Sequence, residues 1–203
     1  MNIVAFTGAG ISRPSGIPTF AELGEDFRRR LSRPLFQRDP MAVYETLLTL
    51  REACLRAQPN AAHLALARFD VPVITMNIDG LHRRAGTRDL IEIHGSMETL
   101  RCDGCRETYP FEQARRGCRC PGCDGLLEHD VVLYGDSIPL LSTALDKVGG
   151  QGVLLVVGTS FVTSTAGYVV DHARACGREV VVINSDAERE VPRFLEQADL
   201  HGF

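Results

Sequence analysis

The 203-residue sequence lacks several features that would assign it to a special class of protein. It has no apolar run near the roughly 20 residues of a membrane-spanning helix, so we expect no membrane association. It has no basic stretch followed by an apolar signal core near its start, so we expect a cytoplasmic protein. It lacks a basic excess, since its net charge is −4, and this argues against general nucleic-acid binding. Internal repeats and low-complexity tracts are also absent.

What remains is the composition of an ordinary globular protein. Hydrophobic residues make up 44% of the chain and charged residues 24%. The length suffices for one full domain and a small additional module.

A glycine turn follows the first apolar segment. Residues 2–6 have the length and β-branching of a buried strand, and Gly8 and Gly10 come directly after it. Glycines at this point let the chain turn sharply and let a ligand approach the backbone, and Ser12 would cap a helical turn that follows. This arrangement is typical of phosphate binding, although it is also typical of a plain tight turn. Arg13 occupies the place of the third glycine of the dinucleotide fingerprint, which argues against an ordinary hydride-transferring enzyme.

Further predicted strands cover residues 71–75, 90–93, 153–157 and 180–183. Most are followed by small or polar residues able to contact a ligand. Because parallel strands bring their carboxyl ends to one edge, we predict an α/β fold, a doubly wound parallel Rossmann-like sheet, with one long site along that edge. The residues at that edge are Asn77, Asp79, His94, Gly158, Thr159, Ser160, Asn184, Ser185 and Asp186.

The segment between the glycine turn and the second strand has two parts. Residues 21–36 are loop-like, and their arginines, Arg28, Arg29, Arg30 and Arg33, fit either a solvated surface or a phosphate site. Residues 41–57 and 61–69 are predicted helices, the first beginning at Asp39-Pro40.

Two cysteine pairs predict a zinc site. Cys102-x-x-Cys105 and Cys120-x-x-Cys123 each form a knuckle, and two knuckles make a tetrahedral four-cysteine site, which is usually structural. Cys118 could replace Cys120, but Cys120-Pro-Gly-Cys123 makes the better knuckle. We therefore predict a small zinc-binding module over residues 96–130, inserted into the larger domain. A zinc ribbon that binds nucleic acid would look similar.

Taken together, the motifs resemble those of the sirtuins, which are NAD-dependent protein deacylases. The resemblance spans nearly the whole chain, and six motifs occur in the family's order. They are Gly8-Ala9-Gly10-Ile11-Ser12 with Ser15-Gly16-Ile17-Pro18-Thr19-Phe20, Asn77-Ile78-Asp79 with His82, His94-Gly95, the cysteine pairs, Gly158-Thr159-Ser160 and Asn184-Ser185-Asp186. Val131-Val132-Leu133-Tyr134-Gly135-Asp136 and Gln58-Pro59-Asn60-Ala61-Ala62-His63 also look like family segments.

The resemblance implies an NAD-binding domain over residues 1–95 and 131–203, within which 21–57 supply the cofactor loop and a helical segment. It implies NAD as co-substrate, one structural zinc ion and an acyl-lysine protein as substrate. Its catalytic residues would be His94, as general base, with Asn77 and Asp79. NAD would contact Gly8, Ala9, Gly10, Ser12, Phe20, Asn77, Asp79, Gly158, Thr159, Ser160, Asn184, Ser185 and Asp186, and the substrate would pair with the backbone of Leu133, Tyr134 and Gly135.

Two positions depart from the family pattern. Ala21 stands where the family usually has Arg, and Met76 where it usually has Gln. Both favour an alternative activity on the same fold, ADP-ribosyl transfer or NAD hydrolysis, and a non-catalytic NAD- or protein-binding module is a further alternative. Family members that remove acidic acyl groups carry a Tyr and an Arg where Leu47 and Leu50 stand here, so we expect neutral acyl groups to be preferred.

Overall fold

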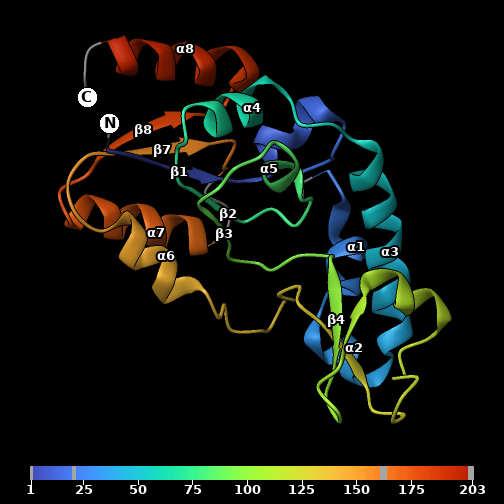
Figure 1. Ribbon diagram of the computed structural model, residues 1–203. Coiled ribbons are helices and arrows are strands. Elements are labelled where there is room, and N and C mark those ends of the chain that lie inside the picture. Colours follow the sequence, from blue (N-terminus) through green and yellow to red (C-terminus); the bar gives the residue numbers. More distant parts are fainter. Residues whose placement is uncertain (1, 20–21, 161–163, 201–203) are drawn as a thin grey trace.

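The structure is a computed structural model that describes residues 2–19, 22–160 and 164–200. Its largest element is a five-stranded parallel sheet in the order β3-β2-β1-β7-β8 (Figure 1). This confirms the predicted doubly wound α/β sheet. The strands are β1 (Ile3–Thr7), β2 (Val73–Thr75), β3 (Leu90–Glu92), β7 (Val153–Val157) and β8 (Glu179–Ile183).

Strand β1 lies at the centre of the sheet, and every side chain in it is buried. The chain runs from β1 outward to β2 and β3, and it returns on the other side of β1 to form β7 and β8. The order of the strands therefore reverses between β1 and β7. In open α/β sheets this switch point, at the carboxyl ends of the strands, is where ligands bind.

Helices cover both faces of the sheet, and alternate residues of β1 belong to different cores. Ile3 and Ala5 pack with α4 and α8, whereas Val4 and Phe6 pack with α6 and α7. Figure 1 shows α4 and α8 above the sheet and α6 and α7 below it. These helices are α4 (Ala61–Arg68), α6 (Leu141–Val148), α7 (Ser164–Ala175) and α8 (Ala187–Leu200).

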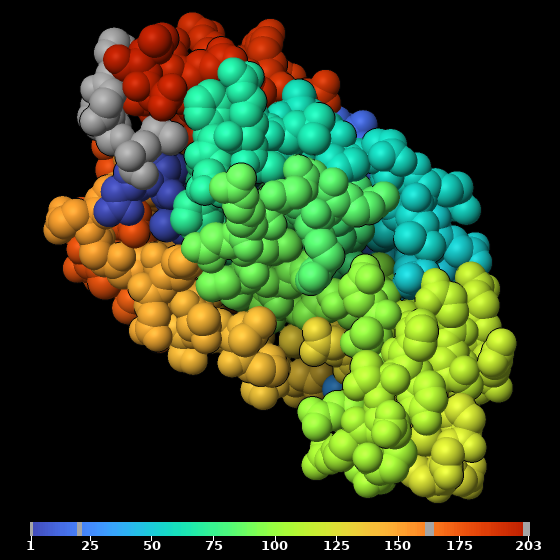
Figure 2. Space-filling view, viewed as in Figure 1, coloured from blue at the N-terminus to red at the C-terminus, as the bar shows by residue number. Residues whose placement is uncertain are grey.

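A smaller antiparallel sheet, in the order β5-β4-β6, belongs to a separate lobe (Figure 2). It lies beside three helices of the N-terminal half, and one hydrophobic core joins them. The helical segment therefore packs with the cysteine-bearing segment. The elements are β4 (Thr99–Cys102), β5 (Thr108–Pro110), η2 (Phe111–Arg116), β6 (Leu127–His129), α1 (Gly24–Arg30), α2 (Arg33–Arg38) and α3 (Pro40–Arg56).

The prediction that residues 21–36 are loop-like is wrong for most of that segment. Helix α1 carries Glu25 and Asp26 in its first turn and three arginines in its last. The acidic side chains therefore lie at the positive end of the helix dipole and the basic ones at its negative end, which stabilises the helix. None of its residues is buried, so it has no apolar stripe from which a helix could be predicted.

The expected role of Ser12 as a helix cap is also wrong. The first helical element after the glycine turn is the 3₁₀ helix η1 (Ala9–Ser15), and Gly8 occupies its cap position. Ser12 lies inside η1 and is fully buried. Its hydroxyl is therefore directed into the protein, where it forms the contacts of the site below.

The remaining described helix is α5 (Leu81–Arg84), which follows the polar residues after β2. Among the helices that the structure describes, none is long and apolar enough to cross a membrane.

Candidate functional site

The glycines of the switch point are in backbone contact. The N–H of Gly8 donates to Val157 at 3.0 Å, and the N–H of Gly10 donates to the carbonyl of Gly158 at 2.8 Å. A Cβ at Gly10 would lie 2.7 Å from the Gly158 backbone, and Gly158 itself has a φ of +65°. Only glycine lets the ends of β1 and β7 meet this closely, so these glycines fix the shape of the crevice.

Asn77, Ser12 and Asp79 form one hydrogen-bonded cluster beside that crevice. The Ser12 hydroxyl donates to Oδ2 of Asp79 at 2.6 Å. The Asn77 amide donates to the Ser12 hydroxyl at 3.2 Å and to the carbonyl of Gly8 at 3.1 Å. Both amide hydrogens of Asn77 are therefore used, and its Oδ1 has no donor among the residues that the structure describes. This oxygen can accept a hydrogen bond from a ligand.

Both oxygens of the Asp79 carboxylate accept hydrogen bonds. Its Oδ1 accepts the N–H of Leu81, the first residue of α5, at 2.8 Å. Burial raises the pKa of Asp79, whereas the hydrogen bonds from Ser12 and Leu81 lower it in part. The structure thus brings together three residues, Ser12, Asn77 and Asp79, that the sequence places in separate motifs.

Two buried histidines lie behind this cluster, with ring centroids 4.7 Å apart. His63 lies 3.4 Å from the Ser12 hydroxyl, and its Nδ1 lies 3.0 Å from Oδ1 of Asn60. His82 lies 3.0 Å from the hydroxyl of Thr7. Burial lowers the pKa of His63 to about 4 and that of His82 well below its ordinary value, so both rings are neutral at pH 7.

His94 follows β3, and its ring contacts Met76, the residue before Asn77. Its Nδ1 lies 3.0 Å from the carbonyl oxygen of Met76, which can only accept a hydrogen bond, so Nδ1 carries the proton. The other ring nitrogen, Nε2, is then an unprotonated acceptor. Burial lowers the pKa of His94, and the hydrogen bond to Met76 raises it in part. The ring is therefore neutral at pH 7 and able to accept a proton.

The far end of the crevice lies after β7 and β8. The Asn184 side chain accepts the N–H of Thr159 at 2.9 Å and donates to the Thr159 carbonyl at 2.8 Å. This pair of bonds fixes the two strand ends together. Ser160, Ser185 and Asp186 are exposed there. A cavity of about 350 Å³ is lined by Asn184 and Ser185 together with residues of β8 and α8.

The segment predicted to pair with the substrate is already paired within the chain. The N–H of Tyr134 donates to Leu31 and its carbonyl accepts from Arg33, both at 2.9 Å. The N–H of Leu133 donates to Oδ2 of Asp136 at 2.9 Å. Strand addition at Tyr134 would therefore require residues 31–33 to move.

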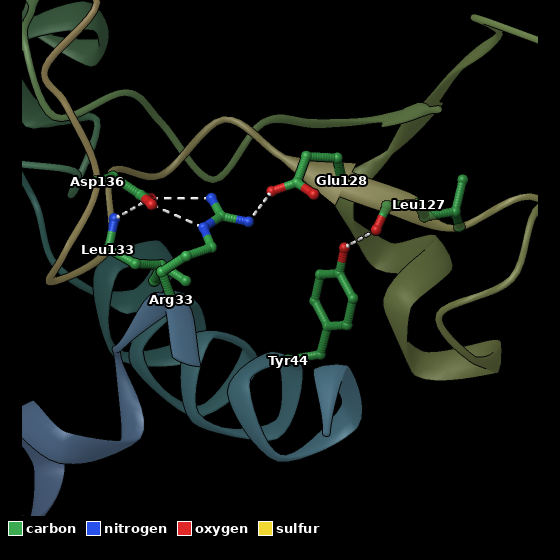
Figure 3. A network of polar contacts seen from close by, with 6 residues as sticks. All are labelled: Arg33, Tyr44, Leu127, Glu128, Leu133 and Asp136. Carbon is green, nitrogen blue, oxygen red and sulfur yellow. Dashed lines mark hydrogen bonds and ion pairs between the residues drawn. The ribbon is translucent and has the colours of Figure 1, made fainter. Parts of the chain in front are cut away.

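The side chain of Arg33 connects this segment to the smaller lobe by hydrogen bonds (Figure 3). Its guanidinium donates to both oxygens of Asp136, at 2.7 and 2.8 Å, and to Glu128 in β6 at 2.5 Å. Burial would raise the pKa of Asp136, but the hydrogen bonds from Arg33 and Leu133 bring it below its ordinary value. No pattern in the sequence predicts this contact, because Arg33 and Asp136 are 103 residues apart.

The four cysteines predicted as zinc ligands lie together in the smaller lobe. Their sulfur atoms are all within 4.8 Å of one another, and Cys118 is not among them. A zinc ion with Zn–S bonds of about 2.3 Å places its sulfurs about 3.8 Å apart. The observed separations, 3.4 Å for Cys102–Cys123 and 3.7 Å for Cys105–Cys120, fit that requirement. The cluster is therefore compatible with one structural zinc ion.

Of the predicted NAD contacts, Phe20 lies outside the described residues, as does Ala21. The others follow the carboxyl ends of β1, β2, β7 and β8 in the parallel sheet. Sequence reasoning assigns neither His63 nor His82 to the site: it predicts a structural role for His63 and leaves a structural and a functional role equally open for His82. No local pattern could show that they lie against Ser12 and Thr7, since both partners are more than fifty residues away.

Comparison with known proteins agrees with this geometry. A model of the Sir2 family matches residues 8–165. A protein of Pyrococcus furiosus named NAD-dependent protein deacylase is 39% identical over 209 residues, which cover 93% of this chain and 84% of that protein.

Two solved structures are similar over nearly the whole chain. A Sir2 homolog in complex with NAD has a TM-score of 0.82 and 28% identity, covering 98% of this chain and 90% of that one. A Sir2 protein bound to a propionylated peptide has a TM-score of 0.81 and 28% identity, covering 98% and 92%. With the family model matching more than half of its length, the chain belongs to the Sir2 family.

Proposed function

We propose that this protein is an NAD-dependent deacylase that removes acyl groups from lysine side chains of proteins. The products are free lysine, nicotinamide and an O-acyl-ADP-ribose. The names of the relatives support this activity. The observation that carries the proposal is the hydrogen-bonded cluster of Ser12, Asn77 and Asp79 at the switch point of the sheet, with the neutral ring of His94 beside it.

The carboxyl ends of β1, β2 and β7 carry groups suited to NAD. The close-packed glycines Gly8, Gly10 and Gly158 leave backbone rather than side chains at the strand ends, which suits a pyrophosphate. Ala9, Ser12, Thr159 and Ser160 complete this part of the proposed site. Asn184, Ser185 and Asp186 hold the adenosine side, next to the cavity of about 350 Å³. Phe20 is proposed to cover the nicotinamide ribose.

Asn77 and Asp79 position the reactive end. When bound, NAD supplies a ribose carbon made electrophilic by nicotinamide as leaving group. The free Oδ1 of Asn77 accepts a hydrogen bond from the ligand, while Asp79 keeps the Ser12 hydroxyl oriented. His94 acts as the general base and accepts a proton at Nε2, because Nδ1–H is committed to the carbonyl of Met76.

The acyl-lysine substrate approaches the segment Leu133-Tyr134-Gly135, which lies between the main sheet and the smaller lobe. The zinc ion, held by Cys102, Cys105, Cys120 and Cys123, supplies no chemistry and stabilises that lobe. The cytoplasmic setting and the lack of nucleic-acid binding stay predictions from the sequence.

The test is product analysis by mass spectrometry after incubation with NAD and an acyl-lysine peptide. Wild type should give O-acyl-ADP-ribose, and His94→Ala should be slower by a factor of about 10² to 10⁴, the usual contribution of a general base. His172→Ala, which removes a histidine of α7 outside the site, is the matched control. Plain ADP-ribose without peptide deacylation would instead support the alternative, NAD hydrolysis or ADP-ribosyl transfer, and no turnover would support a non-catalytic binding module.

A further inference from the structure

A second cavity, of about 560 Å³, is lined by arginines of helices α1 and α2. No acidic side chain lines it in the part of the chain that the structure describes. Pro34, Leu35 and Tyr134 give it an apolar wall, and nearly half of the Tyr134 side chain is exposed. We call this cavity the arginine groove; its lining residues are Arg28, Arg29, Arg30, Ser32, Pro34, Leu35, Arg38 and Tyr134.

The arginine groove is fixed in place rather than carried on a free loop. Residues Leu31 and Arg33, on either side of Ser32, are hydrogen-bonded to the backbone of Tyr134. The guanidinium of Arg33 holds Asp136 and Glu128, so it is not part of the groove (Figure 3). The groove arginines therefore lie beside Tyr134 in a defined arrangement.

The positive charge of the groove is only partly compensated. Arg29 and Arg30 share a single carboxylate, that of Asp26. Arg28 donates to the carbonyl of Gly24, which is neutral. Arg38 makes no ion pair with any residue that the structure describes. Four cations therefore face one carboxylate, and the groove favours an anionic ligand.

We propose that the arginine groove binds acidic residues of the protein substrate, so that the enzyme prefers acyl-lysines flanked by Asp or Glu. This inference rests on the proposed deacylase function and adds a substrate class to it. Tyr134 belongs both to the groove and to the segment beside which the acyl-lysine is placed, so residues flanking that lysine reach the groove. A polyanion such as a nucleic acid is less suited, because the rest of the chain is acidic, with a net charge of −4 overall.

The test uses one acetyl-lysine peptide in three versions, with two Glu, two Gln or two Lys near the acetyl-lysine, on each side in turn. Each exposed ion pair changes affinity by a factor of about 1.4 to 5, so two pairs predict an advantage of about 2- to 25-fold in kcat/KM for the Glu peptide. The advantage should appear in KM rather than in kcat, and it should shrink between 50 and 500 mM NaCl, roughly as exposed charges are screened.

Two variants locate the effect. Arg28→Gln combined with Arg38→Gln should reduce the ratio of Glu-peptide to Gln-peptide kcat/KM to about 1, and Arg38→Glu should shift preference toward the Lys peptide. Arg88→Gln is the matched control, since it removes one exposed arginine that pairs with Asp70 and does not line the groove. It should keep the wild-type ratio.

The outcomes separate this inference from the proposed function. If wild type deacetylates all three peptides with equal kcat/KM, the inference is wrong and the deacylase function stands. If wild type deacetylates none of them, the proposed function itself fails. Binding of a single-stranded oligonucleotide that Arg38→Glu abolishes, without any peptide preference, would assign the groove to nucleic acid and overturn the inference.

Discussion

Replacing Arg33 with Met should destabilise the fold, because Arg33, at the start of helix α2, forms ion pairs with Glu128 in β6 and with Asp136 in the segment after it. The guanidinium is 26% exposed, and its partners Asp136 and Glu128 are 16% and 30% exposed. Breaking a fully buried ion pair costs about 3–5 kcal/mol, whereas an exposed pair contributes about 0.2–1 kcal/mol. For these half-buried groups we expect a loss of about 2 kcal/mol. In a chain of this length that lowers the Tm by about 4–8 °C.

The assay is urea denaturation of wild type, Arg33→Met, Asp136→Asn and the double variant. A coupling free energy of about 1 kcal/mol or more between the two positions would show that the pair itself contributes. Arg88→Met is the control, because its ion pair with Asp70 is exposed and should contribute less than about 0.5 kcal/mol. Equal midpoints for wild type and Arg33→Met would refute the reasoning.

The pH dependence provides an independent check. Arg33 helps to hold the pKa of Asp136 below its ordinary value of 3.8, so the stabilisation is complete above that value. It is lost as the pH falls through the lower pKa of the folded protein. Burial raises the pKa of Glu128, the other partner of Arg33, above its ordinary value of 4.5. The difference in unfolding free energy between wild type and Arg33→Met should therefore be largest near neutral pH, shrink first as Glu128 is protonated, and shrink further below about pH 4 as Asp136 is protonated.

Two further predictions concern the zinc ion and the acyl group. Elemental analysis of protein purified without chelator should find one zinc per chain. Cys120→Ser should lose the zinc and Cys118→Ser should retain it, since only Cys120 belongs to the sulfur cluster. Zinc loss from Cys118→Ser would contradict this prediction. Acetyl- and butyryl-lysine peptides should have kcat/KM values at least about tenfold above that of a succinyl-lysine peptide. Leu47 and Leu50 are buried apolar residues, so they would leave the carboxylate of the succinyl group unpaired, at a cost of several kcal/mol. A succinyl preference would show that these leucines do not line the acyl site.

The parts of the site that could be predicted from sequence are those encoded locally. Each strand end is a short apolar run followed by glycine or a polar residue, and parallel pairing alone then brings Gly8, Asn77 and Gly158 to one edge. The cysteine spacing was equally informative, because two knuckles can bind one metal whatever surrounds them.

The parts that could not be predicted depend on contacts between distant residues. The arginines of residues 28–33 look alike in sequence, yet Arg33 forms a half-buried ion pair while Arg28 lines an open groove. Helix α1 was missed because it buries no residue, so no apolar periodicity marks it. The backbone of Tyr134 was expected to be available to a substrate, but its partners at residues 31–33 lie about a hundred positions earlier in the chain.

Helix α3 links the cysteine-bearing lobe to the site. Near its start, the hydroxyl of Tyr44 donates to the carbonyl of Leu127 in β6 at 2.5 Å. At its other end, the carbonyls of Cys54 and Ala57 accept hydrogen bonds from the guanidinium of Arg84 at 2.7 and 2.8 Å. Because the last carbonyls of a helix have no partner within it, Arg84 both caps α3 and ties α5 to it.

Helix α5 in turn begins at Leu81, whose N–H is held by Asp79, and the other oxygen of Asp79 accepts the Ser12 hydroxyl. A continuous series of hydrogen bonds therefore runs from the lobe of the cysteine cluster through α3 and α5 to the proposed nicotinamide end. Zinc in such a site contributes folding free energy to its lobe. Removing zinc should therefore destabilise the lobe in which the hydroxyl of Tyr44 is hydrogen-bonded to Leu127, at the opposite end of α3 from Arg84.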